Sequence, residues 1–183
     1  MTTPPLRGNI SELVLWNRSH AAALVRIAND ESVARYLLPG FPQPYRIDDA
    51  NNWIRQQEHA SEPTHFAIEE SGILVGSIGL TFGTNERAGS AFVGYFLGRM
   101  HWGRGIATDA LKTITAYAFG FSSIYRVWAN VMGPNFASSR VLEKAGFVRE
   151  ATLKAAIVDR NGDQHDEHIY ATLRADRFPM TTN

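Results

Sequence analysis

The fold is decided by one stretch of the chain, residues 93–108, which read VGYFLGRMHWGRGIAT. The first five residues form an apolar run typical of a strand, and the last ones open a helix whose apolar positions recur at spacings of three and four. Two glycines one residue apart, Gly103 and Gly105, lie in the loop between them. Helix N-termini attract anions, and glycine lets a backbone approach a bulky anion closely. The stretch predicts a phosphate-binding loop, with glycines that serve only the loop's own turns as an equal alternative.

Two familiar phosphate-binding motifs do not fit this loop. A P-loop needs GxxxxGK followed by Ser or Thr, whereas residues 98–105 read GRMHWGRG and lack both the lysine and the hydroxyl. A dinucleotide fingerprint needs GxGxxG directly after a strand. Here the two glycines come several residues after Leu97, and Thr108 takes the place of the third glycine. A phosphate bound here is therefore not held in either of these ways.

Outward from this stretch, the hydrophobic periods predict an α+β domain. Strands are expected at residues 13–16, 65–69, 73–80, 92–97, 125–131, 147–158 and 164–173. Helices are expected after the N-cap residues Ser19 and Asp48, at 106–119 and at 141–145, with a shorter helical or turn segment at 33–38. The order of these elements predicts a mixed, mostly antiparallel seven-stranded sheet flanked by about four helices.

The amino-acid composition excludes several classes of partner and of catalytic site. Basic and acidic residues number 18 each, so the net charge is zero, and nothing indicates a nucleic-acid or membrane partner. The absence of cysteine excludes a disulfide framework, a thiolate nucleophile and zinc held by cysteine. The six histidines form no metal-binding pattern, so no metal is expected. We expect a cytoplasmic protein with one domain, residues 1–183, and an ordered core of about 10–175; the oligomeric state is not predicted.

A second informative stretch, residues 135–147, reads NFASSRVLEKAGF and predicts a short helix that ends at Gly146. Asn135 or Ser138 could serve only to cap this helix. Together, the two stretches resemble the GNAT N-acetyltransferase superfamily, and within it the RimJ/RimL-like branch of ribosomal-protein-alanine acetyltransferases. The phosphate motif of the superfamily is matched at residues 102–107, where Trp102 in the first place is similar to that branch. The resemblance covers about residues 10 to 175, including segments at 30–36, 44–50 and 166–170.

The resemblance implies an enzyme that transfers an acetyl group from acetyl-CoA to an amine, with no metal and no covalent enzyme intermediate. Acyl-CoA would lie between the strands at 92–97 and 125–131, which splay apart. Backbone groups near Phe96 and Leu97 would bind the pantetheine and polarise the thioester carbonyl. The catalytic residues would be Ser138, as hydrogen-bond or proton donor to the departing thiolate, and Asn135, on the pantetheine arm. The loop would bind the cofactor through Trp102, Gly103, Arg104, Gly105, Ile106 and Ala107, with the N–H groups of the last five on the pyrophosphate.

The sequence departs from the family at the general base. Relatives often carry a glutamate on the strand before the phosphate loop, or just after it, where this chain has Ser90-Ala91-Phe92 and Gly98-Arg99. The other candidates are Tyr36, Glu69, Glu70, His165, Asp166 and Glu167. Near pH 7.4, about a quarter of an α-amine is already neutral, against about a thousandth of a lysine. A chain without an evident base therefore favours a peptide or protein N-terminus as acceptor. Another donor such as succinyl-CoA, a small-molecule amine, or a non-catalytic CoA sensor remain alternatives.

Overall fold

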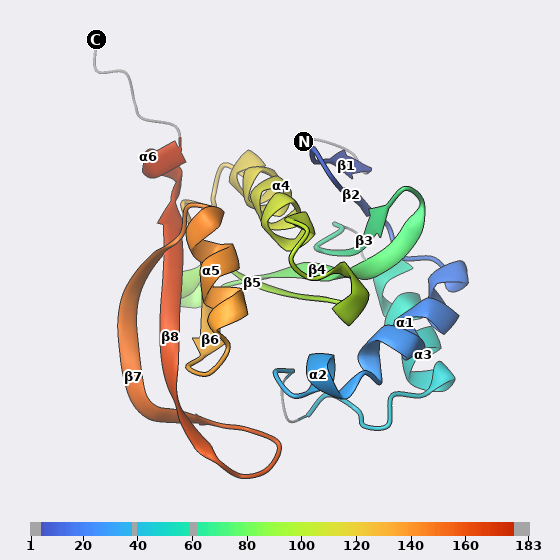
Figure 1. Cartoon of the computed structure of the whole chain (residues 1–183). Helices are drawn as coiled ribbons and strands as arrows, with labels where there is room; N and C mark the ends of the chain where they lie inside the picture. Colours follow the sequence, from blue (N-terminus) through green and yellow to red (C-terminus); the bar gives the residue numbers. More distant parts are fainter. Residues whose placement is uncertain (1–4, 38–39, 59–61, 178–183) are drawn as a thin grey trace.

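The computed structural model describes residues 5–37, 40–58 and 62–177, and its centre is an eight-stranded sheet (Figure 1). The strand order is β1-β2-β3-β4-β5-β6-β8-β7. The strands are β1 (Leu6–Arg7), β2 (Glu12–Val14), β3 (His65–Glu70), β4 (Ile73–Phe82), β5 (Ser90–Leu97), β6 (Arg126–Met132), β7 (Val148–Val158) and β8 (Gln164–Leu173). Only β5 and β6 pair in parallel, which confirms the predicted mixed, mostly antiparallel sheet. The expected count of seven strands was wrong by one, because β1 has two residues and no readable period.

The four expected helices correspond to the longer ones in the structure, α1 (Ala21–Ala28), α3 (Ile47–Glu58), α4 (Ile106–Gly120) and α5 (Phe136–Lys144). The described part of the chain also has two four-residue helices, α2 (Glu31–Ala34) and α6 (Arg174–Arg177). Its three 3-10 turns are η1 (Arg18–His20), η2 (Asn85–Arg87) and η3 (Arg99–His101). The segment expected at 33–38 begins earlier, in α2, and Leu38 lies outside the described residues.

Two expected N-caps were wrong. Asn17, not Ser19, caps the turn before α1, because its side chain accepts from the Ser19 N–H. Asp48 lies inside α3, and the carboxylate that binds a preceding N–H is Asp49, which accepts from Arg46 at 2.7 Å. The pattern locates such helices but not their first residues, and α5 begins at Phe136, earlier than the expected segment at 141–145.

Alternate side chains of the central strands divide the interior into two apolar clusters, one on each face of the sheet. Phe66 and Ile68 of β3 pack in the cluster that contains α4 and the C-terminal half of α5. Ala67 packs in the cluster that contains α1 and α3, together with Phe96. The period of two along a strand and the apolar stripes of the helices produce this layered arrangement.

The sheet opens at its parallel join. Only Ser90, Ala91 and Phe92 of β5 are paired with β6, opposite Arg126, Val127 and Trp128. Beyond Phe92, β5 stays paired with β4 as far as Leu97, while β6 stays paired with β8 as far as Met132. The predicted splaying of these two strands is thus confirmed. No helix in the described part of the chain is long and apolar enough to cross a membrane.

Candidate active site

The loop between β5 and α4 has the geometry of an anion site. Gly103 and Gly105 have φ of 74° and 82°, in the left-handed region that favours glycine. Gly105 is the N-cap of α4, so the loop delivers its backbone directly to a 15-residue helix N-terminus. A Cβ at Gly103 would meet no atom within 4 Å. The glycine at this position therefore leaves open space in front of the loop.

Side chains of the loop are tied back to the protein. The indole Nε1 of Trp102 donates to the Leu97 carbonyl at 2.8 Å, and Nη2 of Arg104 donates to Glu70 Oε1 at 2.7 Å. These two bonds hold the loop to the end of β5 and to the end of β3. Trp102 and Arg104 thus fix the path of the backbone that carries the N–H groups from Gly103 to Ala107.

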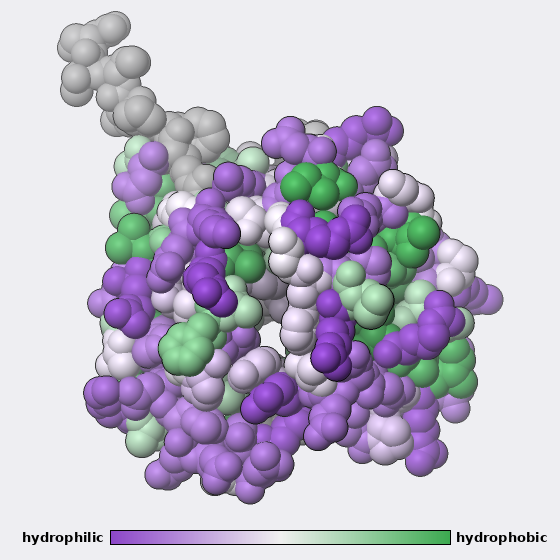
Figure 2. Space-filling view, viewed as in Figure 1, coloured by the Kyte–Doolittle hydropathy of each residue, from purple (hydrophilic) through white to green (hydrophobic). Residues whose placement is uncertain are grey.

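A cavity of about 540 Å³ lies in front of this loop. The opposite wall is formed by α5, by α2 and by Tyr36 and Leu37 after it, and the surface is hollowed between α5 and α2 (Figure 2). Its lining includes the expected residues Phe96, Leu97, Trp102, Gly103, Gly105, Ile106, Ala107, Asn135 and Ser138, with Arg140 and Lys144 of α5. The structure therefore brings together all of the expected cofactor residues in this lining except Arg104.

The strand alternation decides which backbone groups of β5 face the opening. Gly98 N–H donates to the Val75 carbonyl, and Gly83 N–H donates to the Ser90 carbonyl. In this antiparallel register the backbone groups of Phe96 turn toward β4, and those of Tyr95 and Leu97 turn toward the β6 side. Leu97 thus presents backbone to the gap as expected, while Phe96 contributes its side chain and Tyr95 takes the backbone position expected of Phe96.

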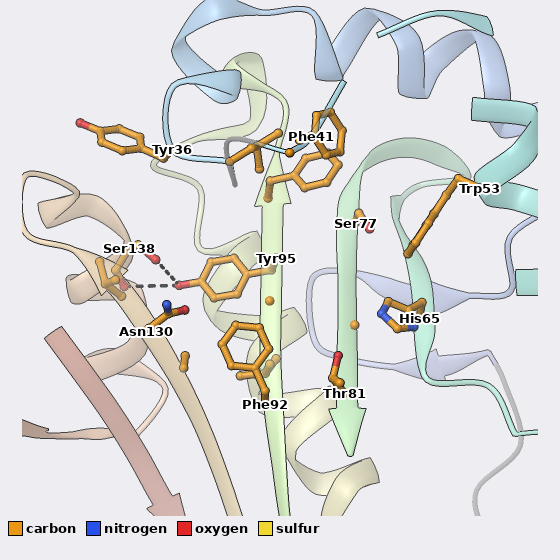
Figure 3. Close-up of a pocket in the computed structure, with 18 of the residues that line it drawn as sticks. Tyr36, Phe41, Trp53, His65, Ser77, Thr81, Phe92, Tyr95, Asn130 and Ser138 are labelled. Atoms are coloured by element: carbon orange, nitrogen blue, oxygen red, sulfur yellow. Dashed lines mark hydrogen bonds between the residues drawn. The ribbon is translucent and has the colours of Figure 1, made fainter. Parts of the chain in front are cut away.

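The start of α5 separates the roles of Asn135 and Ser138. Asn135 is the N-cap, and its side-chain oxygen accepts from Ser138 N–H at 3.2 Å. The Ser138 hydroxyl instead lies 2.8 Å from the hydroxyl of Tyr95, which also lies 3.3 Å from the Ser138 carbonyl (Figure 3). The capping alternative is therefore correct for Asn135 and wrong for Ser138.

Tyr95 is the residue that sequence reasoning missed. Burial raises the pKa of its hydroxyl to about 12, so the group remains a protonated donor at neutral pH. Its sequence signal is a tyrosine on an apolar strand directly before the loop, since a buried tyrosine hydroxyl needs a partner. That partner lies 43 positions away in the chain, which no local pattern indicates.

A second cavity, of about 770 Å³, lies on the face of the sheet covered by α3. Its described lining comes from α1, α3, α5, β3, β4, β5, β6 and the segment before α3. It shares Tyr36, Leu37, Tyr95, Phe96, Asn135 and Ser138 with the first cavity. The two cavities thus meet at the Tyr95–Ser138 pair. Trp53 lines this cavity, whereas Trp16 is buried in the core.

Most of the candidate bases are engaged elsewhere. Glu69 pairs with His20 at 2.9 Å, Glu70 with Arg104, Asp166 with Lys154 at 2.7 Å, and His165 with Asp159 at 3.1 Å, while Glu167 accepts from Asn130 at 2.5 Å. Of the six candidates, only Tyr36 is among the described residues that line either cavity. Asp49 and His65 also line the larger cavity, and burial lowers the pKa of His65 so that its imidazole is neutral at pH 7. Across residues 5–37, 40–58 and 62–177, no three His, Cys, Asp or Glu side chains are grouped to hold a metal ion.

Comparison with known proteins agrees with this geometry. The model of the acetyltransferase (GNAT) domain matches residues 12–148. A probable N-acetyltransferase of Bacillus subtilis, YjcK, is 38% identical over 117 residues, which are 63% of this chain and 64% of YjcK. This match spans a little under two thirds of the relative's length.

Two solved structures extend the likeness to nearly the whole fold. RimJ of Mycobacterium smegmatis, in complex with CoA-disulfide, superposes with a TM-score of 0.79 at 25% identity, over 93% of this chain and 84% of RimJ. RimL, a ribosomal L7/L12 α-N-protein acetyltransferase in complex with CoA, superposes with a TM-score of 0.78 at 21% identity, over 92% and 96%. With the family model spanning most of the sheet, the glycine loop and α5, the chain belongs to the GNAT acetyltransferase family.

Proposed function

We propose that this protein transfers an acetyl group from acetyl-CoA to a primary amine, and that the acceptor is the α-amine of a peptide or protein. One observation carries the proposal: a cavity at an anion-binding loop and a second cavity meet at the Tyr95–Ser138 pair. A two-substrate transfer needs such a junction, because donor and acceptor must approach from different sides.

The smaller cavity fits the donor. The backbone from Gly103 to Ala107 would bind the pyrophosphate at the N-terminus of α4, where N–H groups and the helix dipole favour negative charge. Backbone groups of Tyr95 and Leu97 would bind the pantetheine in the gap between β5 and β6. Asn135 holds the start of α5 against this gap as its N-cap.

The chemistry is a direct displacement. The nitrogen lone pair attacks the thioester carbon, the C–N bond forms, the C–S bond breaks and the sulfur keeps the electron pair. The nitrogen loses one proton, the sulfur gains one, and the products are the amide and the CoA thiol. Ser138 would donate a hydrogen bond to the sulfur as its charge develops, which is an interaction almost absent before the bond breaks. Tyr95 stays protonated and can direct the Ser138 hydroxyl by donating to its oxygen.

The acceptor class follows from the lack of an evident general base among the described residues at the junction of the two cavities. An α-amine has a pKa of about 8 and a lysine amine about 10.4, so the α-amine reacts at neutral pH with little help. The groups that line the junction supply hydroxyls and an amide rather than a carboxylate, since Tyr36, Tyr95, Asn135 and Ser138 are the polar residues common to both cavities. Such a site suits an amine that is already partly neutral.

The experiment compares two peptides of the same sequence, one with a free N-terminus and one with a blocked N-terminus and a free lysine. Mass spectrometry should show acetylation of the first, at a rate far above that of the second, at pH 7.4. Equal rates would contradict the α-amine assignment and point to a base. Succinyl-CoA in place of acetyl-CoA tests the donor. CoA binding without turnover of any donor would show a sensor instead.

A further inference from the structure

The floor of the larger cavity is a pair of glycines. In the antiparallel register of β4 and β5, Gly79 lies directly opposite Gly94. A Cβ on Gly79 would lie 2.1 Å from Cδ2 of His65, so the imidazole already covers that half of the floor. A Cβ on Gly94 would meet only Phe92 Cε1 within 4 Å, at 3.5 Å. Gly94 does not have a positive φ, so its backbone conformation does not require glycine.

Aromatic rings form the walls around this floor (Figure 3). Phe41 stacks on Tyr45 with ring centroids 4.9 Å apart and an interplanar angle of 11°, and its edge meets Phe96 at 6.2 Å. Trp53 meets the His65 ring edge-on at 5.2 Å. Rings in these arrangements present faces and edges that pack well against another aromatic group.

The charges of the lining exclude two kinds of acceptor. No lysine or arginine is among the described residues that line this cavity, so an anionic group would be buried without a partner. Asp49 is the one carboxylate among those residues, and it already accepts from the Arg46 N–H. A polyamine, with several positive charges, would find too few counter-charges. Arg160 is not among the described residues that line the cavity, and its guanidinium donates to the backbone carbonyls of Ala34 and Phe41.

We infer that the acceptor carries an uncharged aromatic side group next to its reactive α-amine, and that this group lies on Gly94 between the rings of Phe41, Phe92 and Trp53. The inference rests on the proposed function and narrows its acceptor to amines or N-termini of this kind. The open space above Gly94 accommodates the aromatic group, and the surrounding rings contact it. The lining has almost no charge, which disfavours acceptors with a charged side group.

The test uses four amides that share the same α-amine arrangement: phenylalaninamide, 4-carboxyphenylalaninamide, 4-aminomethylphenylalaninamide and alaninamide. Calorimetry measures their binding to the CoA-saturated protein, and mass spectrometry measures acetyl transfer. Phenylalaninamide should bind at least about tenfold more tightly than each of the other three, because a buried unpaired charge or a lost ring costs that much. Equal binding of the charged amides, or of alaninamide, would overturn the inference.

Two variants locate the binding place. Gly94→Val should weaken phenylalaninamide binding about tenfold or more, because its branched side chain fills the floor, while CoA affinity stays within about twofold. Gly94→Ala should have a much smaller effect, since its Cβ makes only ordinary contact. Unchanged amide binding in folded Gly94→Val would overturn the inference. If the four amides bind in the predicted order but none is acetylated, the proposed function alone is overturned. If they are acetylated but do not bind in that order, this inference alone is overturned.

Discussion

At the residue scale, the Tyr95–Ser138 contact predicts that Ser138 contributes to catalysis and not to the stability of α5. Ser138 does not cap α5, so Ser138→Ala should leave the melting temperature almost unchanged. It should lower kcat about a hundredfold, at the lower end for a general acid because a thiolate is a good leaving group. The KM for acetyl-CoA should stay nearly constant, since the bond to sulfur strengthens only as the C–S bond breaks. Steady-state kinetics and thermal unfolding of this variant give both quantities.

Asn135→Ala is the matched control. Loss of the N-cap should cost about 1 kcal/mol of unfolding free energy, which for a chain of this size is a fall of roughly 2–4 °C in melting temperature. A destabilised but fully active Ser138→Ala enzyme would instead show that the serine is structural.

The Tyr95 hydroxyl leads to a prediction about pH. Because burial raises its pKa to about 12, the folded state holds this proton more tightly than the unfolded chain, whose tyrosine pKa is about 10. The contribution of this group is therefore complete below pH 10 and is lost as the pH rises toward 12. We expect kcat to show no fall between pH 8 and 10 attributable to Tyr95, and Tyr95→Phe to lower kcat about fivefold through the loss of one hydrogen bond. A descending limb near pH 9 in the wild type that disappears in Tyr95→Phe would contradict this.

The sequence motif predicted Asn135 and Ser138 correctly as neighbours at a helix start, but not which of them was the cap. Both residues have good capping side chains, and the choice depends on the tertiary contact with Tyr95. Long-range partners of this kind leave no trace in local spacing.

At the element scale, the loop before α4 depends on its two left-handed glycines. Gly105→Val should weaken CoA binding about ten- to hundredfold, because several helix-terminus contacts of about 0.3–1 kcal/mol each would be lost. Part of any effect could come from backbone strain at φ 82°. Gly72→Val is the matched control, since Gly72 has φ 76° in the β3–β4 turn and its Cβ would meet nothing within 4 Å. Calorimetry should show full CoA affinity for Gly72→Val; equal losses in both variants would remove the loop from the binding site.

The hairpin of β7 and β8 reaches across the molecule to hold the segment before α3. Asp159 accepts from the N–H groups of Asn161 and Asp163 and orders the turn, and Arg160 donates to the carbonyls of Ala34 and Phe41 at 3.0 and 2.9 Å. Tyr36 and Leu37, which lie between these carbonyls in the chain, line both cavities.

Loss of the hydrogen bonds from Arg160 to these two carbonyls should mainly weaken binding of the acceptor. Arg160→Gln should raise the acceptor KM about five- to tenfold, because bonds from a charged donor contribute about 1.5–3 kcal/mol each. Lys154→Gln, which removes another cation of the same hairpin, should leave it unchanged, since Lys154 is exposed and binds Asp166. Identical kinetics for Arg160→Gln and the wild type would show that the segment holds its position without these hydrogen bonds.

Elements with a clear period were predictable, and those without one were not. The strands and longer helices follow from alternation and amphipathic spacing, whereas β1 has only two residues. Its position depends on Asp109 in the first turn of α4, which accepts from the N–H groups of Asn9, Ile10 and Ser11. A contact across about a hundred positions cannot be read from either segment alone.

At the scale of the whole molecule, the splayed sheet is the feature that produces the site. Two half-sheets, β1 to β5 and β6 to β8, are joined by three residue pairs, and the gap beyond Phe92 connects the two cavities. The chain has no net charge, so the proposed anion binding would rely on the loop and on Arg140 and Lys144 of α5 rather than on a general positive field. The family motifs predicted this division of the sheet. The aromatic cavity under α3 could not be predicted, because its described residues come from seven separate helices and strands and from the segment before α3.

The most direct test of the central claim is a crystal structure of the protein with CoA. We predict the pyrophosphate on the N–H groups from Gly103 to Ala107, the pantetheine in the gap beyond Phe92, and the sulfur beside the Ser138 hydroxyl at the junction of the two cavities. A CoA molecule bound elsewhere, or one whose sulfur points away from the Tyr95–Ser138 pair, would contradict the account.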